Sequence, residues 1–308
     1  MTDLVEQFTA LNSAALRRHP ELSVDAPQAQ QALCERVAAD LEAAKEVRVL
    51  EGGARAGIVL YRSTTRFQDC AEHCRIDIAL DDAEATGWVA TQMRELAPRF
   101  DVSFELQLDV GHRALLPELQ RCGLTPRMKW LHGDPQAALD GLRAGPLNRA
   151  TLSDDLRIEA LSQARHVEPI VTLVREYFER DPGTGPLSPH VSITAAVQAR
   201  LDEFTRDSLN EALGKNTTLV VLRDAEVMGY GAYHPRHDPI MGHFAGLALG
   251  FDPSIQGRGL SKLVYERLLE RMIATGVQLM RGRTANLAVL HLAARMKRPL
   301  RGWQLEPA

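Results

Sequence analysis

Two glycines flank an arginine in the segment DPSIQGRGLSK, which runs from Asp252 to Lys262. Glycine adopts backbone conformations that let successive N–H groups turn outward. The apolar periodicity of the next residues predicts a helix that begins at Leu260. The first amides of a helix have no partner within it, and the helix dipole adds positive potential at the same end. A segment of this kind is suited to binding phosphate.

The spacing of these residues separates the loop from two common phosphate-binding motifs. It matches neither the dinucleotide fingerprint G-x-G-x-x-G nor the P-loop, which is longer and ends in Lys and Ser or Thr. The residues are Gln256, Gly257, Arg258, Gly259, Leu260 and Ser261. They resemble the [Q/R]-x-x-G-x-[G/A] pyrophosphate loop of the GNAT superfamily of acyl-CoA N-acyltransferases. Ser261 stands where that pattern has Gly or Ala, a small change that a helix start should tolerate.

The elements expected around the loop follow the order of that family. The segment GHFAGLALG at 242–250 predicts a buried strand before the loop, and Gly276 is the expected stop of the helix after it. The other expected elements are strands at 156–162, 217–224, 227–235, 277–285 and 302–307 and helices at 169–181, 193–213 and 286–296. A motif that stands in the matching order of elements is far more specific than the motif alone. The resemblance therefore extends over residues 155–308.

The first half repeats this order without the glycine loop. Expected strands lie at 47–53, 57–64, 73–82, 102–110 and 124–133, and expected helices at 84–100 and 112–123. The fold class is therefore α/β (α+β), with two tandem GNAT-like domains. Each domain is expected to have a mixed, mostly antiparallel sheet flanked by helices.

Carboxylates replace the glycines at the corresponding place of the first half. Residues 80–87 read LDDAEATG, and Asp81, Asp82 and Glu84 would repel a pyrophosphate. We therefore expect residues 1–135 to form a degenerate domain without a cofactor loop. Residues 136–154, rich in Gly, Pro and polar residues, are expected to be a linker, and residues 155–308 the cofactor-binding catalytic domain.

The composition narrows the classes of partner. The 308 residues carry a net charge of −4, so that neither nucleic acid nor an anionic membrane is expected to bind. No apolar run is long enough to span a membrane, and the N-terminus has acids where a secretory signal has bases, which favours the cytoplasm. The segment DCAEHC at 69–74 lacks a second ligand pair, so that no metal site is expected. A monomer or a homodimer is expected.

The resemblance also implies a place for the cofactor, acetyl-CoA or another acyl-CoA. In the family, the cofactor arm lies where the fourth and fifth strands separate, and a backbone amide of the fourth strand holds the acyl carbonyl. Here this amide would come from Leu247, Ala248 or Leu249. Asn286 matches an asparagine that touches the cofactor arm, and the same residue is a good helix N-cap.

The acid and base residues depart from the family pattern. The expected fourth strand has no glutamate, and His243 is the candidate general base because its ordinary pKa of about 6.5 suits proton transfer near neutral pH. A hydrogen-bonded histidine at a strand end is the alternative interpretation, and His234, His237 and Asp238 are loop polar residues or line the acceptor pocket. The usual tyrosine acid is replaced by Ala293, which leaves water, a proton relay, Tyr265 or Tyr233 to protonate the thiolate.

The sequence thus favours an acyl-CoA-dependent N-acyltransferase, most simply of acetyl groups, that acts on a small amine in a ternary complex. Two alternatives stay open: a GNAT-fold enzyme with another outcome, such as O-acylation, decarboxylation or biosynthetic acyl transfer, and a non-catalytic acyl-CoA-binding regulatory module. The acceptor would be set by the helices at 169–181 and 193–213, by the loop between them and by the first half. Glu176, Glu179 and Asp181 either attract an amine or form a solvated helix face.

Overall fold

The computed structural model describes residues 2–50, 56–62, 74–80, 85–96, 104–144, 152–180, 195–257 and 259–307. Several predictions from the sequence lie outside these residues. They concern Arg258 of the glycine loop, the first-half carboxylates Asp81, Asp82 and Glu84, Cys70 and His73 of the DCAEHC segment, and Asp181. No helix of the described part is long and apolar enough to cross a membrane.

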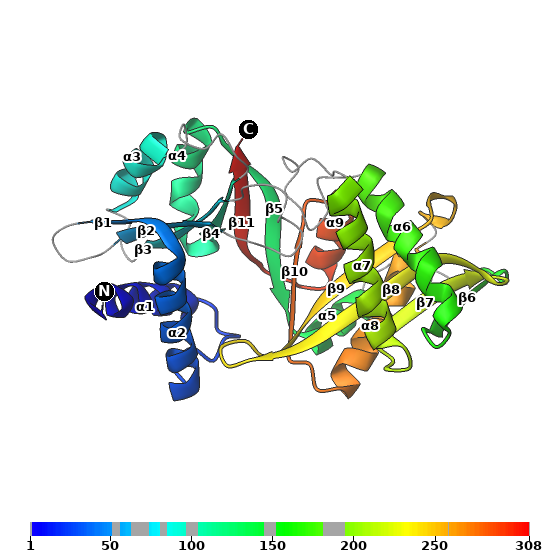
Figure 1. The fold of residues 1–308 in the computed structure, drawn as a ribbon. Helices are drawn as coiled ribbons and strands as arrows, with labels where there is room; N and C mark the ends of the chain where they lie inside the picture. Colours follow the sequence, from blue (N-terminus) through cyan, green and yellow to red (C-terminus); the bar gives the residue numbers. More distant parts are fainter. Residues whose placement is uncertain are drawn as a thin grey trace.

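The first half begins with two helices and continues with alternating strands and helices (Figure 1). Its elements are α1 (Thr2–Leu16), α2 (Pro27–Ala43), β1 (Ala44–Val49), β2 (Ala56–Arg62), β3 (Cys74–Leu80), α3 (Thr86–Leu96), β4 (Phe104–Asp109), α4 (Leu116–Arg121) and β5 (Leu124–Gly133). Strands β1 to β3 form antiparallel hairpins, whereas β3 and β4 are parallel. Helix α5 (Pro135–Ala144) follows β5.

The second half repeats this succession with one further strand at its start. Its elements are β6 (Leu156–Ala160), α6 (Val167–Arg180), α7 (Ala195–Ala212), β7 (Thr218–Arg223), β8 (Glu226–Asp238), β9 (Gly242–Phe251), α8 (Leu260–Ala274), β10 (Leu279–Thr284), α9 (Leu287–Arg295) and β11 (Leu300–Pro307). Strands β9 and β10 are the parallel pair of this half, as β3 and β4 are in the first. The mixed, mostly antiparallel sheet with flanking helices confirms the predicted fold class.

The two halves share one continuous 11-stranded sheet in the described part of the chain, in the order β1-β2-β3-β4-β11-β5-β10-β9-β8-β7-β6. The last strand of each half has crossed to the other. Strand β11 pairs with β4 on one side and β5 on the other, while β5 also pairs with β10. Each half thus completes its sheet with a strand of its partner half, which Figure 1 shows at the centre of the molecule.

The hairpin between β8 and β9 makes a further connection between the halves. Ile240 at its tip is 3% exposed and packs among Phe8, Leu33 and Val37 of α1 and α2. The backbone N–H of Ser23 donates to the Ile240 carbonyl at 2.9 Å. Figure 1 shows this hairpin reaching from the second half to the N-terminal helices. Burial of this apolar tip holds α1 and α2 over one face of the sheet.

The structure adds elements that the sequence analysis did not include. Helices α1 and α2 precede β1 and correspond in order to α6 and α7 of the second half. Helix α5 begins at Pro135 and occupies the first part of the segment 136–154 that was expected to be a linker, and its Ala138, Leu139 and Leu142 are buried in the same core as α8. The turn between β7 and β8 consists of Asp224 and Ala225, one residue earlier than expected.

Candidate functional site

Strands β9 and β10 separate part-way along their length. Their parallel pairing covers only Phe244, Ala245 and Gly246 of β9, and Arg281 is the last residue of β10 that pairs with β9. Beyond this point β9 pairs with β8 alone, and β10 pairs with β5. Backbone groups of a sheet interior need partners, and the edges that face this gap have none from the other strand. Leu247, Ala248 and Leu249, the residues predicted to hold the acyl carbonyl, lie on this part of β9.

The glycine loop connects the far end of β9 to α8. Gly257 and Gly259 both have φ of +76°, a conformation that other residues rarely adopt. A Cβ added to Gly257 would meet no atom within 4 Å, so that the loop is open on this side. Gln256 does not point away from the protein, since its side-chain amide donates to the Phe251 carbonyl at 2.9 Å. Gln256 therefore fixes the loop to the end of the strand.

Helix α8 begins without a side-chain cap. Gly259 is its N-cap residue and has no side chain to accept from the first amides. The Lys262 N–H donates to the Gly259 carbonyl at 3.0 Å. Leu260 is 4% exposed and anchors the first turn in the core. The start of α8 thus combines free amides, the positive end of the helix dipole and an open loop.

Asn286 lies at the start of α9, just after β10. Its side-chain oxygen accepts from the N–H groups of Ala288 and Val289, at 2.9 and 3.3 Å. This confirms its role as a helix N-cap; its contact with a cofactor stays a prediction. The neighbouring Leu287 is 73% exposed, an unusual exposure for a leucine.

His243 lies at the other end of β9 from the glycine loop. Its Nδ1 donates to the Gly276 carbonyl at 3.0 Å, and its own carbonyl accepts from Gln278 N–H at 2.8 Å. Because side chains alternate along a strand, His243 shares a face with Ala245, which is buried in the core with α8. His243 therefore connects β9 to the turn between α8 and β10. Its role as a base is not tested by this placement.

The residues considered for thiolate protonation are buried or distant from one another. Tyr233 is 1% exposed, and its hydroxyl lies 3.4 Å from Thr275 Oγ1 at the end of α8. Tyr265 on α8 is 5% exposed, and burial raises the pKa of its hydroxyl. Ala293 is buried in the core, and His291 is exposed. Among these residues the structure singles out no general acid.

The acidic and histidine residues considered for the acceptor have separate positions. Asp238 forms an ion pair with Arg36 of α2 and accepts from the Ile240 and Met241 N–H groups, so that it shapes the hairpin tip. Glu176 and Glu179 are exposed on α6. No three His, Cys, Asp or Glu side chains of the described residues gather in a way that could hold a metal ion.

The sequence analysis missed a set of polar residues between the two halves. His132 of β5 contacts Glu21 through its Nδ1 at 2.8 Å, and Glu21 also accepts from Arg301 of β11 at 2.6 Å. Arg298 is 7% exposed and donates to the Leu131 carbonyl at 3.1 Å. These residues are far apart in the chain and meet because β5 and β11 pair with strands of the other half. No local sequence signal reveals this pairing.

Comparison with known proteins agrees with this geometry. Residues 187–297 match the model of the Acetyltransferase (GNAT) family. No curated protein matches the chain. A GCN5-related N-acetyltransferase from Sphaerobacter thermophilus has a similar structure, with a TM-score of 0.55, 12% identity, and coverage of 89% of this chain and 84% of that one.

Two further solved structures share the fold at low identity. A tandem GNAT protein from the clavulanic acid biosynthesis pathway has a TM-score of 0.51 and 16% identity, with 99% of this chain and 94% of that chain covered. A glucosamine N-acetyltransferase region of a fungal multi-domain β-N-acetylglucosaminidase has a TM-score of 0.55 and 13% identity; 99% of this chain and 37% of that one are covered. Residues 187–297 thus match the GNAT acetyltransferase family, and the chain as a whole has a fold similar to that of a tandem GNAT protein.

Proposed function

We propose that the protein transfers an acyl group, most simply acetyl, from acyl-CoA to the amino group of a small molecule in a ternary complex. The observation that carries this proposal is the separation of β9 from β10, together with the uncapped start of α8 in the loop that follows β9. The gap offers unpaired backbone groups for the acyl arm, and the helix start offers amides for the pyrophosphate. Both features lie in the half that matches the family model.

Each part of the site then has a role. The amides around Gly257, Gly259, Leu260 and Ser261 bind the pyrophosphate, and the Arg258 side chain adds a charge-assisted contact. The unpaired edge of β9 at Leu247–Leu249 binds the acyl carbonyl. The thioester supplies the activated acyl group, and the protein acts chiefly by positioning, which alone can lower a barrier by several kcal/mol.

Exposed Leu287 and the N-cap Asn286 stand at the start of α9, which follows β10 in the chain. We assign them to contact with the cofactor arm. An apolar side chain that is 73% exposed is covered when the arm lies against it, which contributes to binding through the hydrophobic effect.

Calorimetric titration with acetyl-CoA tests the cofactor site. Gly257→Glu places a carboxylate at the expected pyrophosphate position and is expected to weaken binding at least about 100-fold. Gly214→Glu is the matched control, because Gly214 has φ of +75° and equally open surroundings. Both variants share the backbone strain, so that only the location of the charge differs. An equal loss of acetyl-CoA affinity in both variants, or two equal acetyl-CoA sites per chain, would contradict the proposal.

Thiol release across a panel of amines tests turnover. Release that depends on the amine, with the N-acyl product seen by mass spectrometry, is the expected result. Tight acyl-CoA binding without turnover for any acceptor would favour a regulatory module instead. An ester product from a hydroxyl acceptor would favour O-acylation.

His243 is the proton acceptor that the sequence proposes. With Nδ1–H bonded to the Gly276 carbonyl, the neutral imidazole has an unprotonated Nε2 that can accept a proton. His243→Gln decides between catalysis and structure. A general base contributes about 100-fold or more, and its loss would also flatten the acidic limb of the pH–rate profile. A fall in melting temperature with kcat within about threefold would assign His243 to the connection between β9 and Gly276.

A further inference from the structure

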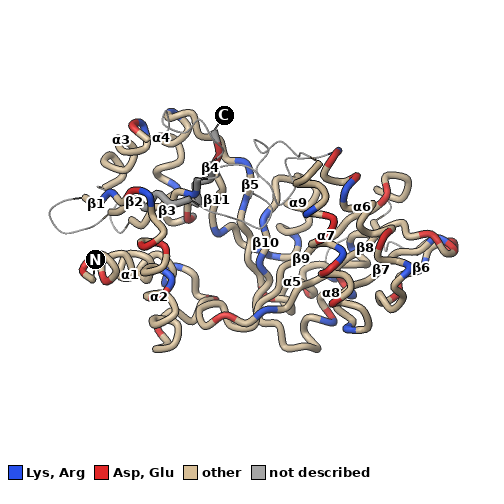
Figure 2. The backbone as a smooth tube through the Cα atoms, in the orientation of Figure 1, with Lys and Arg blue, Asp and Glu red and all other residues tan. Residues whose placement is uncertain are grey.

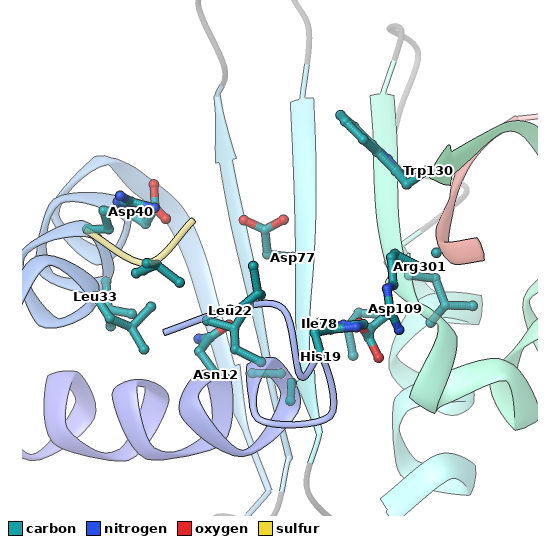
Figure 3. Close-up of a pocket in the computed structure, with 18 of the residues that line it drawn as sticks. Asn12, His19, Leu22, Leu33, Asp40, Asp77, Ile78, Asp109, Trp130 and Arg301 are labelled. Atoms are coloured by element: carbon teal, nitrogen blue, oxygen red, sulfur yellow. The ribbon is translucent and has the colours of Figure 1, made fainter. Parts of the chain in front are cut away.

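A cavity of about 350 Å³ lies between the two halves and is separate from the glycine loop. Its wall comes from α1 and α2, from β3, from β5, β10 and β11 at the centre of the sheet, and from the tip of the β8–β9 hairpin. Figure 3 shows Asp40 on α2 on one side of this cavity and Trp130 and Arg301 on the other. A volume of this size suits a small metabolite.

Most charged side chains of the cavity wall already have partners. Arg75 pairs with Asp77 at 3.1 Å, Arg301 with Glu21, and Asp109 with His19. Arg36 pairs with Asp238. Such pairs need no ligand to balance their charge.

Arg281 of β10 is different. Its guanidinium lies over the Trp130 ring, 4.7 Å from the centroid, and 3.6 Å from the sulfur of Met241. Within the described part of the chain it has no carboxylate contact, and burial lowers its pKa. Arg283 lies two residues further along, and Figure 2 shows Lys and Arg positions along β5 and β10. The charge of Asp238 acts on Arg281, but Arg75, Arg283 and Arg36 add positive charge around it, so that this end of the cavity favours an anionic ligand group.

Asp40 of α2 places a negative charge on the other side of the cavity. It is half-buried and has no hydrogen bond or ion pair among the described residues. Burial and the neighbouring Asp77 raise the pKa of its carboxyl group, although the charges of Arg75 and Arg36 oppose this shift. A positively charged ligand group would relieve both effects. The side of the cavity at Arg281 therefore favours a negatively charged ligand group, and the side at Asp40 favours a positively charged one.

The strand register connects this cavity to the gap between β9 and β10. Gly246 pairs with Arg281 on one side and with His234 of β8 on the other, and Arg281 in turn pairs with His132 of β5. Residues paired in this way point to the same face of the sheet, and neighbouring strands lie about 5 Å apart. Gly246 is also the last β9 residue paired with β10. Arg281 therefore borders both the cavity and the point where the acyl arm would end.

We propose that this cavity binds the acyl acceptor, and that the acceptor is a small α-amino acid whose carboxylate pairs with Arg281. The assignment rests on the proposed acyl transfer. With its carboxylate at Arg281, the ligand holds its α-amino group beside Gly246, where the missing side chain leaves room. A cationic side chain then extends toward Asp40, which favours diamino acids such as lysine or ornithine over glutamate.

The reaction balances without a further reagent. The neutral amine forms a bond to the acyl carbon as the carbon–sulfur bond breaks, the amine gives up a proton and the thiolate gains one. The products are an N-acyl amino acid and free coenzyme A. The positive charge of Arg281 disfavours a neighbouring ammonium, and so lowers the pKa of the α-amino group and increases its reactive neutral fraction.

Pairs of amines that differ only in the carboxylate test the ligand class. Lysine and ornithine are compared with cadaverine and putrescine, their decarboxylated forms, at saturating acetyl-CoA. The expected result is a kcat/KM at least about 30-fold higher for each amino acid, as a charge-assisted contact in a buried site allows. Equal values within each pair would overturn the proposal. Lysine should also exceed glutamate, and Asp40→Asn should reduce that preference.

Arg281→Gln tests the anchor, with Arg283→Gln as the matched control. Arg283 lies on the same strand and face and also over Trp130, at 5.6 Å, but does not line the cavity. Arg281→Gln is expected to raise KM for lysine at least about 30-fold, whereas KM for cadaverine, which has no carboxylate, should not rise; Arg283→Gln should change neither KM more than about threefold. Equal effects of the two variants, or an equal effect on both amines, would overturn the assignment.

Acetyl-CoA binding by calorimetry, measured on the same proteins, separates this inference from the function on which it rests. Loss of binding in the unmodified protein would refute the acyltransferase proposal itself. Normal binding and turnover with indifference to Arg281 would refute only the acceptor site.

Discussion

At the scale of single residues, the sequence predicts backbone conformation and helix capping better than it predicts the roles of side chains. Gly257 and Gly259 have the positive φ that the loop pattern implies, and Asn286 caps α9 as its position suggests. These are local properties, decided by neighbours in the chain. His243 and Arg298 show the limit. His243 bonds to a carbonyl 33 residues away, and Arg298 is buried and donates to the Leu131 carbonyl of β5.

Buried His132 supplies a prediction of pH-dependent stability. Burial lowers its pKa to about 4, even though Glu21 at Nδ1 favours the charged form, and the nearby Arg281 and His19 lower the pKa further. In the unfolded chain the His132 imidazole binds a proton near pH 6.5, whereas in the folded chain it does so only near pH 4. Stability is therefore complete above pH 6.5 and is lost as the pH falls toward 4.

Urea unfolding at pH 7.5 and pH 5 measures this loss. The shift predicts that the His132 contribution to the free energy of unfolding falls by roughly 2 kcal/mol over this interval. His132→Gln should remove that part of the pH dependence, while the exposed His291→Gln should leave it unchanged. Glu21 acts at lower pH, because its own pKa is lowered. An unchanged pH dependence in His132→Gln would contradict the assignment.

At the scale of elements, most of the second half follows from apolar periodicity and glycine punctuation. Strands β6 to β9 and helices α6 to α9 lie within a few residues of the expected ranges. Helix α2 was missed, although its buried Ala29, Leu33 and Val37 recur every four residues and carry a usable signal. Helix α5 was taken for a linker because Gly and Pro flank it. Its burial depends on α8 and α9, which the local sequence does not reveal.

The contact between α5 and α9 gives a prediction about packing. A Cβ added at Gly141 of α5 would lie 2.3 Å from the carbonyl oxygen of Arg295, a backbone atom that cannot move aside alone. Alanine usually favours a helix over glycine by up to about 1 kcal/mol. Here overpacking should dominate, so that Gly141→Ala destabilises the protein by about 1–3 kcal/mol.

Thermal and denaturant unfolding of Gly141→Ala beside Gly87→Ala checks this balance. Gly87 lies near the start of α3, and an added Cβ would meet no atom within 4 Å there. Gly87→Ala is therefore expected to be neutral or stabilising. Equal behaviour of the two variants would show that the close approach of α5 to α9 does not hold in solution.

At the scale of the whole molecule, the order of strands in the sheet could not be read from the sequence. The elements of each half appear in the expected succession, but β5 and β11 exchange places between the halves. Strand order depends on pairings between segments far apart in the chain. The hydrophobic pattern of a strand identifies the face that it buries, whereas it does not identify its neighbour.

This exchange predicts that the two halves unfold together. Strand β11 lies between β4 and β5 of the first half, β5 pairs with β10 of the second, and Ile240 is buried beneath α1 and α2. Removal of residues 300–308 would leave β4 and β5 without their common neighbour and expose the core around Leu305, which is fully buried. The first half then cannot complete its sheet, and β5, which completes the sheet of the second half, loses its other neighbour, so that stability should be lost in both.

Native-state hydrogen exchange in increasing urea distinguishes one unit from two. Amides of β2 in the first half and β7 in the second, both remote from the exchanged strands, should reach exchange through openings of the same free energy and the same urea dependence. The isolated fragment 155–308 should lack this protection altogether, because β5 is missing between β10 and β11. Independent opening of β2 and β7, or a folded 155–308 fragment, would show that the tandem halves are separable domains joined only in sequence.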